Sequence, residues 1–501
     1  MATPPEVVPS VDSVEHPVEF RKALGLFDSI MIVAGIMVGS GIFIVSAEIS
    51  RQVGSSGWLL VAWVITGVLT LSAALSYGEL AAMMPQAGGM YVYLREAFSP
   101  LLGFLYGWTL LTVIQTGTIA AVAIAFARFS GVAFPIISES HYLIAPVRVL
   151  PGYAFSLSTA QALALSIILL TAIINCYGVQ WGKLIQNIFT VAKLTGMVAL
   201  LVLGAIAFFL HPNVFHANFI GAWHPHNVVG IGDVSAVTAF GMFVALCVSQ
   251  TGSLFSADSW HNVTFVAGEV RNPKRNLPLA LGLGTLLVIT LYILCNLCYL
   301  AVLPLQAIQT APGDRVATLV VATILPNFGK LAMGLLIMVS TFGTVNALTF
   351  AGGRACYAMA QDGLFFRRAG QLNKARVPGW ALVLQCLWSL FLVLPRTYDT
   401  ATGQYGNLYS NLLDYVISAE LLFYILTVAA LFRLRRTRPN APRPYRAWGY
   451  PWLPVLYIIG AAIVLAVLFC YRTATTWPGL LIIASGVPVY FFLRRRSSKP
   501  M

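Results

Sequence analysis

The stretch Gly35-Ile36-Met37-Val38-Gly39-Ser40-Gly41-Ile42-Phe43 decides how this chain folds. It lies in the middle of the first long apolar segment, where a membrane helix is expected to be most regular. Three glycines and a serine weaken that helix, because an interior glycine costs about 1 kcal/mol relative to alanine. In hydrocarbon, a broken backbone is tolerated only where it lines a cavity or is buried in protein. The stretch therefore predicts a break in the helix whose exposed backbone groups bind a ligand.

The composition is that of an integral membrane protein. Of the 501 residues, 58% are hydrophobic and only 9% are charged, and the mean hydropathy is +0.81. A soluble domain carries about 25% charged residues. All 7 cysteines lie in apolar segments, which argues against a disulfide framework. Cys295 and Cys298 have the spacing of a metal or redox pair, but mid-helix they are better explained as buried small side chains.

Twelve apolar segments, each suited to cross a bilayer as a helix, follow one another along the chain. Their approximate cores are 27–49, 58–83, 101–133, 159–177, 184–210, 235–267, 278–303, 330–360, 379–395, 407–432, 453–471 and 476–493. Most of the 30 Lys and Arg residues fall on one side if the N-terminus is inside. This bias predicts cytoplasmic N- and C-termini and explains the net charge of +13 without nucleic acid.

A second broken segment matches the first. Polar and small residues crowd the middle of the sixth segment, over 250–261, with Asp258 at the centre. Two interrupted helices at corresponding positions of two inverted halves indicate the midplane binding site of a secondary transporter. We therefore predict an all-α fold of two inverted five-helix repeats, at about 25–210 and 235–433, followed by two extra helices.

The apolar segments and the polar stretches around them divide the chain into four parts. They are a disordered cytoplasmic tail (1–21), the transporter core (22–433), a cytoplasmic linker with the last two helices (434–496) and a short C-terminal tail (497–501).

Several short motifs follow one another in a fixed order. They occupy residues 39–43, 77–80, 85–93, 96–98, 269–278, 340–346 and 443–446. Together they resemble the amino acid–polyamine–organocation superfamily of permeases and, within it, a prokaryotic member of the L-type amino acid transporter family. The resemblance covers roughly residues 22–460 and implies a LeuT-like fold that exchanges amino acids by alternating access.

The resemblance also implies a substrate site at the two breaks. The substrate carboxylate would meet backbone amides at Gly39, Ser40 and Gly41. The substrate ammonium would meet backbone carbonyls at Met37, Phe255, Ser256 and Asp258. Helix N-termini favour anions and helix C-termini favour cations, so elementary electrostatics agrees with this assignment. Phe255 matches the gating aromatic of the family, which closes over the substrate.

Lys193 lies in the middle of the fifth segment, where a charge costs about 2.5–3.5 kcal/mol on insertion scales. By resemblance, its ammonium stands where sodium-coupled relatives bind an ion, and it would tie the fifth helix to the first break. It therefore favours sodium-independent exchange. Glu420, deep in the tenth segment, is expected either to pair with Lys193 or to bind a proton. Arg354 is expected to snorkel to the cytoplasmic surface, and Asp414 to be solvated.

Asp258 has two open explanations: it caps the helix that follows, or it attracts a cationic or polar side chain of the substrate. The neighbouring residues depart from the resemblance. Ser259 replaces a glycine of the relatives and Ala257 replaces a tyrosine, which alters the pocket for the substrate side chain.

We predict a multi-pass transporter of the cell membrane that exchanges amino acids, mainly small neutral L-amino acids, without sodium, metal or cofactor. A proton-coupled permease, or one for cationic amino acids or polyamines, is the main alternative. A membrane sensor or an integral-membrane enzyme on the same scaffold is the alternative from another class, but no catalytic constellation is present.

Partners other than substrate and lipid are not expected. Animal members of the family join a heavy chain through a cysteine between helices three and four, and the corresponding loop, 134–158, has none. The histidines of one outer loop do not have the spacing of a compact zinc site; they are His211, His216, His224 and His226.

Overall fold

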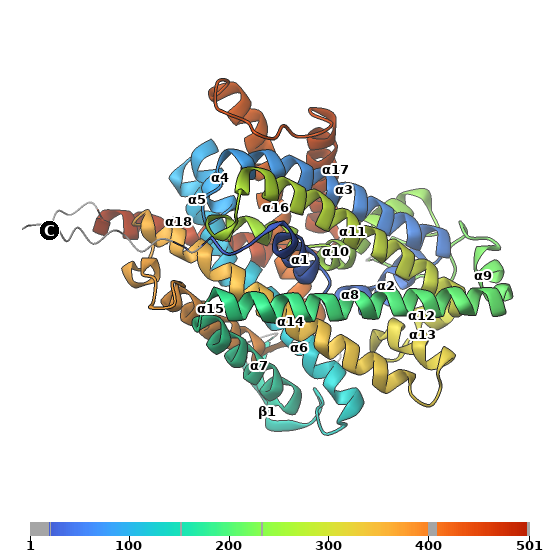
Figure 1. The fold of residues 1–501 in the computed structure, drawn as a ribbon. Coiled ribbons are helices and arrows are strands. Elements are labelled where there is room, and N and C mark those ends of the chain that lie inside the picture. The colour runs from blue at the N-terminus through green and yellow to red at the C-terminus, as the bar shows by residue number, and fades with distance from the viewer. Residues whose placement is uncertain (1–19, 21, 151–152, 232–233, 399–407, 498–501) are drawn as a thin grey trace, which may run out of the picture.

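The computed structural model describes residues 20, 22–150, 153–231, 234–398 and 408–497, which are built almost entirely of helices that run beside one another (Figure 1). In this part of the chain, ten helices are long and apolar enough to cross a membrane, or eleven if a bent pair counts as one span. The predicted all-α membrane class is confirmed. The predicted tails lie outside the described residues, apart from Phe20 and Ser497.

The spans agree closely with the apolar segments. They are α3 (Ser56–Met83), α5 (Pro100–Thr109) continued by η1 (Leu110–Ile114) and α6 (Gln115–Ala133), α7 (Thr159–Cys176), α8 (Val179–Leu210), α10 (Ala239–Ser256), α11 (Pro273–Val302), α14 (Gly329–Gln361), α16 (Leu408–Thr437), α17 (Trp452–Tyr471) and α18 (Thr473–Ser497). The ninth segment forms α15 (Gly379–Val393), which is apolar but shorter than the others. The number of twelve spans therefore stays a prediction.

Polar side chains fix where several of these helices begin. The hydroxyl groups of Ser55, Ser99, Ser158 and Thr238 each accept a hydrogen bond from a backbone N–H in the first turn of α3, α5, α7 and α10. Such caps satisfy donors that the helix itself leaves unpaired, and each is worth about 1 kcal/mol. The span boundaries therefore follow from local sequence.

The first apolar segment is broken. α1 (Leu26–Met37) and α2 (Gly41–Val53) are bent by 42° at the residues between them. The sequence placed the break within 35–43, and the structure narrows it to 38–40. α1 lies near the centre of the view in Figure 1 and packs against α8, α11 and α14.

The sixth segment is broken as well. α10 ends at Ser256, and a 3₁₀ helix, η2 (Trp260–Thr264), follows after three residues. η2 packs against α1, so both breaks lie at the same place in the bundle. Two breaks that meet support the predicted inverted repeat, although the repeat itself stays a prediction.

Shorter elements connect the spans. They are α4 (Met90–Ala97), α9 (Pro212–Phe219), η3 (Ala267–Glu269), α12 (Leu305–Gln309), η4 (Pro312–Asp314), α13 (Val316–Ile324) and η5 (Arg367–Gly370). A small antiparallel sheet in the order β1-β2-β3 joins β1 (Tyr142–Leu150), β2 (Tyr153–Ser158) and β3 (Pro395–Thr397). We predicted only a loop at 134–158 and missed the hairpin of β1 and β2, to which the distant β3 adds a third strand.

Candidate functional site

The break in the first span exposes backbone groups. α1 ends at Met37 and α2 begins at Gly41, and the N–H of Gly39 donates to the carbonyl of Met37 at 2.8 Å. The first N–H groups of a helix have no acceptor within it, and the helix dipole adds positive potential there. The N-terminus of α2 is therefore suited to a carboxylate, as predicted for residues 39–41.

Gly41 brings the two breaks into contact. A Cβ atom on Gly41 would lie 2.2 Å from the hydroxyl oxygen and 2.9 Å from the Cα of Ser256. No real side chain tolerates such distances, so the backbone of α2 approaches the end of α10 only because residue 41 is glycine. The structure thus places the predicted residues Gly41 and Ser256 side by side.

Tyr292 of α11 holds both breaks at once. Its hydroxyl oxygen lies 2.7 Å from the carbonyl oxygen of Met37 and 2.9 Å from that of Ser256. The single phenolic proton is therefore shared between the last carbonyls of the two half-helices. The carbonyl of Ser256 retains a second lone pair, whereas that of Met37 also accepts from the N–H of Gly39.

Lys193 contacts the first break, as predicted. Its buried ammonium donates to the carbonyl oxygens of Gly35 at 2.7 Å and Val38 at 2.8 Å, and to the hydroxyl of Thr344 at 2.9 Å. Three acceptors match the three donors of an ammonium group. The alternative pairing of Lys193 with Glu420 is wrong, because Lys193 is engaged at the first break and Glu420 lies beside His261.

α14 supports the same carbonyls. Ser340 donates to the carbonyl of Val38 at 3.0 Å, and Thr344 lies 3.2 Å from that of Gly35. The break therefore rests on two neighbouring helices, α8 and α14. Ser340 and Thr344 fall in the motif 340–346, but nothing in that motif predicted that they lie at the break.

Phe255 and Asp258 flank the break in the sixth span, and both are buried. The carboxylate of Asp258 accepts from the hydroxyl of Tyr424 at 2.6 Å and from that of Ser259 at 3.1 Å. The capping explanation for Asp258 is wrong, because the N-cap of η2 is Ser259 and no side chain caps it. Asp258 is instead bonded to α16.

Ser259 has a backbone conformation that favours glycine. Its φ is 64° and its ψ is 7°, in the left-handed region, which costs a residue with a side chain roughly 1–2 kcal/mol. The glycine that the resemblance implies at this position is thus explained by the backbone. This chain places serine there, and its hydroxyl bonds Asp258.

Arg354 does not reach the surface, so the expectation that it snorkels is wrong. It is 1% exposed, and its Nε lies 3.0 Å from a carboxylate oxygen of Glu269, which is equally buried. A buried guanidinium needs a buried acid, and Glu269 follows the sixth span directly. The side chain of Asp414 lies outside the described residues.

Glu420 lies beside the second break. Its carboxylate oxygen is 3.7 Å from Nε2 of His261, and both side chains are buried. With Asp258 they form a group of three acidic or imidazole side chains whose ligand atoms all lie within 4.8 Å of one another. The sequence left Glu420 as a partner of Lys193 or a proton site, and the second alternative stays a prediction. It did not single out His261, which looked like an ordinary residue of an interrupted helix.

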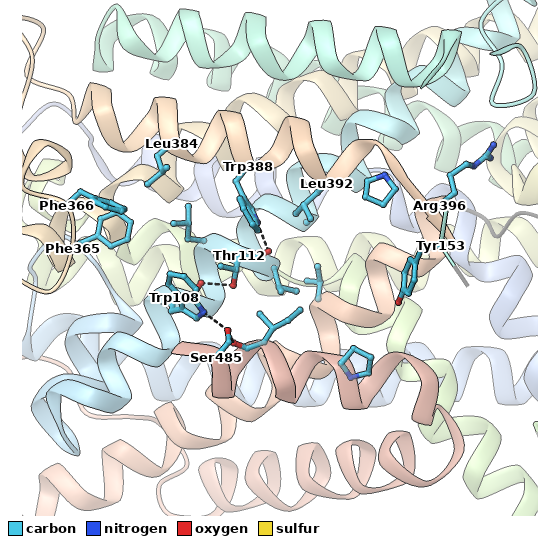
Figure 2. Close-up of a pocket in the computed structure, with 17 residues that line it drawn as sticks. Trp108, Thr112, Tyr153, Phe365, Phe366, Leu384, Trp388, Leu392, Arg396 and Ser485 are labelled. Atoms are coloured by element: carbon cyan, nitrogen blue, oxygen red, sulfur yellow. Dashed lines mark hydrogen bonds between the residues drawn. The ribbon is translucent and has the colours of Figure 1, made fainter. Parts of the chain in front are cut away.

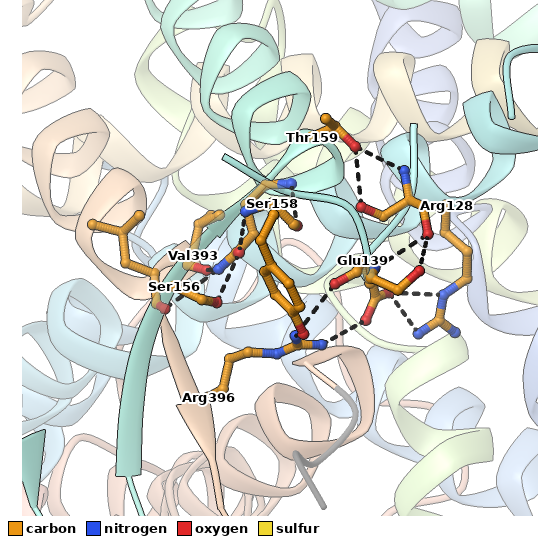
Figure 3. Close-up of polar contacts among 12 residues, drawn as sticks. Arg128, Glu139, Ser156, Ser158, Thr159, Val393 and Arg396 are labelled. Atoms are coloured by element: carbon orange, nitrogen blue, oxygen red, sulfur yellow. Dashed lines mark hydrogen bonds and ion pairs between the residues drawn. The ribbon is translucent and has the colours of Figure 1, made fainter. Parts of the chain in front are cut away.

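A polar network lies at the predicted extracellular face (Figure 3). Glu139 accepts from Arg128 of α6 at 3.0 Å and lies 3.5 Å from a guanidinium nitrogen of Arg396 in β3. Gln161 of α7 donates to the carbonyl of Val393 at 2.8 Å. These contacts join the sheet to α6, α7 and α15.

The predicted cytoplasmic face has its own ion pairs. The buried Glu79 of α3 receives Arg435 at 2.6 Å and Arg443 at 3.2 Å. Nearby, Arg438 contacts Glu96 of α4 at 2.8 Å, and this hydrogen bond lowers the pKa of Glu96. The basic stretch after α16 is therefore fixed against α3 and α4.

A cavity of about 610 Å³ lies away from the breaks, between η1, α15 and α18 (Figure 2). Its lining is mainly apolar. Two tryptophans of the lining make hydrogen bonds: Trp388 donates to the carbonyl of Thr112, and Trp108 donates to the hydroxyl of Ser485. No residue predicted to bind substrate lines it. We do not assign the substrate to this cavity, since an amino acid requires polar partners.

Comparison with known proteins agrees with these features. The family model "Amino acid permease" matches residues 24–493. The human b(0,+)-type amino acid transporter 1 is 30% identical over 481 residues, covering 94% of this chain and 88% of its own length. The rat large neutral amino acids transporter small subunit 2 is 29% identical over 488 residues, covering 95% and 81%. The chain therefore belongs to the amino acid permease family, which consists of transporters and not of enzymes.

Proposed function

We propose that this chain exchanges amino acids across the cell membrane by alternating access without sodium, and that it prefers small neutral L-amino acids. The observation that carries the proposal is the pair of hydrogen bonds from Lys193 to the carbonyls of Gly35 and Val38. These carbonyls belong to the place where, by resemblance, sodium-coupled relatives bind an ion. A permanently attached ammonium supplies the positive charge there, so no sodium ion is needed.

The substrate carboxylate binds at Gly39, Ser40 and Gly41, where α2 begins; the N–H of Gly39, which donates to Met37, would have to turn to the substrate. The substrate ammonium binds the carbonyls at the ends of the two preceding half-helices, at Met37 and Ser256. In support, the hydroxyl of Tyr292 contacts both carbonyl oxygens, which therefore lie close to each other. A zwitterion placed across the breaks meets both dipoles with favourable sign. Phe255 is the gate that excludes water from this site.

The contacts of Asp258 support a neutral side chain over a cationic one. Its carboxylate already accepts from Tyr424 and Ser259 and is bonded toward α16. These donors already satisfy part of the carboxylate, which leaves less of its negative charge for a cationic substrate. The close approach of Gly41 and Ser256 also leaves little width between the breaks, which suits a small substrate.

Counterflow in liposomes tests the proposal. Purified protein in liposomes loaded with unlabelled alanine should accumulate labelled alanine from a sodium-free medium, and a protonophore should not abolish this uptake. Arginine should exchange much less than alanine. Uptake that requires sodium or a proton gradient, or that ignores internal amino acid, would contradict exchange; a preference for arginine would contradict the neutral pocket.

The topology is a further part of the proposal. Both termini are cytoplasmic, and the chain works without a disulfide-linked heavy chain, since the segment 134–158 has no cysteine. Reporter domains fused to either end should be active only in the cytoplasm. Activity of either fusion outside would reverse the orientation.

A further inference from the structure

Three buried side chains lie close together at the break of the sixth span. Asp258 lies in the break, His261 in η2 and Glu420 in α16, and one ligand atom from each lies within 4.8 Å of the others. Their exposed fractions are 4%, 1% and 0%. We infer that these residues form a binding site for one divalent transition-metal ion of the zinc class.

The charges favour a cation. Neither carboxylate is paired with a lysine or arginine in the part of the chain that the structure describes. A buried carboxylate without such a partner must be neutralised, either by a bound cation or by a proton. One divalent cation balances the charges of Asp258 and Glu420, and the neutral imidazole of His261 adds no further charge.

The hydrogen bonds of Tyr424 fix which nitrogen of His261 is available. The Tyr424 hydroxyl lies 2.6 Å from the carboxylate of Asp258 and 2.6 Å from Nδ1 of His261. With Asp258 ionised, the phenolic proton goes to Asp258, so Nδ1 carries the proton that His261 donates to the phenol oxygen. Nε2 then presents its lone pair. A metal-binding histidine has this arrangement, with one nitrogen on the metal and the other donating to a neighbour.

Nε2 of His261 faces Glu420 at a distance suited to a metal. Their separation of 3.7 Å is too long for a hydrogen bond, which needs about 2.7–3.2 Å. Two tetrahedral ligands with bonds of 2.0–2.2 Å lie about 3.3–3.6 Å apart. Nε2 and both oxygens of Glu420 also have no hydrogen-bond partner among the described residues. A cation bound between Nε2 and the carboxylate of Glu420 would satisfy these acceptor atoms.

The available space also selects a single ion. A cavity of about 20 Å³ borders the cluster at Asp258, Glu420 and Tyr424, whereas His261 does not line it; apolar and aromatic side chains make up most of the rest of its lining. This volume holds one water molecule or ion and excludes an amino acid side chain. The metal would join the broken sixth span to α16, a role independent of which substrate is transported. This inference replaces our expectation that the chain has no metal site.

Metal binding to the full-length, untagged protein tests the inference. After chelator treatment and dialysis, the protein should bind about one Zn²⁺ per chain, and its melting temperature should rise by at least a few degrees. Glu420→Gln should weaken Zn²⁺ binding at least tenfold. Tyr424→Phe should weaken it about 10–100-fold through loss of the bond to His261. The control is the double variant His224→Ala/His226→Ala, which should keep the site and remove only weak binding by the outer loop.

X-ray absorption at the zinc edge is measured on the unmodified protein. It therefore tests the metal site even if the Glu420→Gln variant does not fold. It should show one imidazole nitrogen and otherwise oxygen ligands at 2.0–2.2 Å. Sulfur ligands, several imidazoles, or no stoichiometric Zn²⁺ would overturn the inference, the last because protons alone would then neutralise the cluster. Since none of these measurements involves transport, failure here and failure of the proposed exchange are separate results.

Discussion

The ammonium nitrogen of Lys193 lies 2.7 Å from the carbonyl oxygen of Gly35, although 158 positions separate the two residues in sequence. The contact joins α8 to the last turn of α1, where the helix loses its regular hydrogen bonds. Each buried carbonyl left without a donor costs about 1–3 kcal/mol. Lys193 therefore stabilises the broken conformation that the proposed substrate site requires.

Replacing Lys193 by methionine should reduce alanine counterflow at least tenfold. Methionine fills similar space but leaves the carbonyls of Gly35 and Val38 without the ammonium. The protein should still insert and remain monodisperse, as gel filtration in detergent would show. Lys330→Met, at an exposed lysine, is the matched control and should transport normally. Full transport by Lys193→Met would refute the role of Lys193.

Gly41→Ala should abolish most transport, because the new Cβ would overlap Ser256. Adding Ser256→Gly removes the hydroxyl and Cβ from the contact and should recover part of the activity. The recovery is only partial since the Cα of Ser256 would still lie 2.9 Å away. Gly282→Ala in α11, whose nearest neighbour is at 3.5 Å, serves as the control. If Gly41→Ala and Gly282→Ala behaved alike, the close contact of the breaks would be disproved.

Ser259→Gly and Ser259→Ala separate backbone strain from hydrogen bonding. Both lose the bond to Asp258, but only glycine relieves the cost of a φ of 64°. The glycine variant should therefore be more stable than the alanine variant by about 1 kcal/mol. Thermal unfolding in detergent measures this order. The reverse order would show that residue 259 does not have the left-handed conformation.

The buried pair Arg354–Glu269 should show strong coupling. Arg354→Met alone leaves a buried carboxylate without its cation and should destabilise the protein by about 3–5 kcal/mol. The double variant Arg354→Met/Glu269→Gln should be more stable than Arg354→Met, because it removes both charges. A double-mutant cycle on thermal stability gives the coupling. Additive effects of the two substitutions would argue against the pair.

The sequence by itself determined the class of fold, the positions of the spans and the two breaks. These features depend on local composition: apolar length sets a span, and clustered glycine, serine and polar residues interrupt a helix. It also identified Lys193, since a charge in the middle of an apolar segment is costly wherever it lies. The motif order was enough to identify the family.

Only the tertiary structure decided which residues meet. The roles of Tyr292, Tyr424 and His261 could not be predicted. A tyrosine or histidine in a span has the same sequence pattern whether its side chain only packs or also donates a hydrogen bond. Glu420 and Arg354 were assigned wrong surroundings for the same reason: sequence shows that a buried charge needs a partner, and it does not show which helix supplies one. That choice depends on how helices far apart in the chain pack against each other.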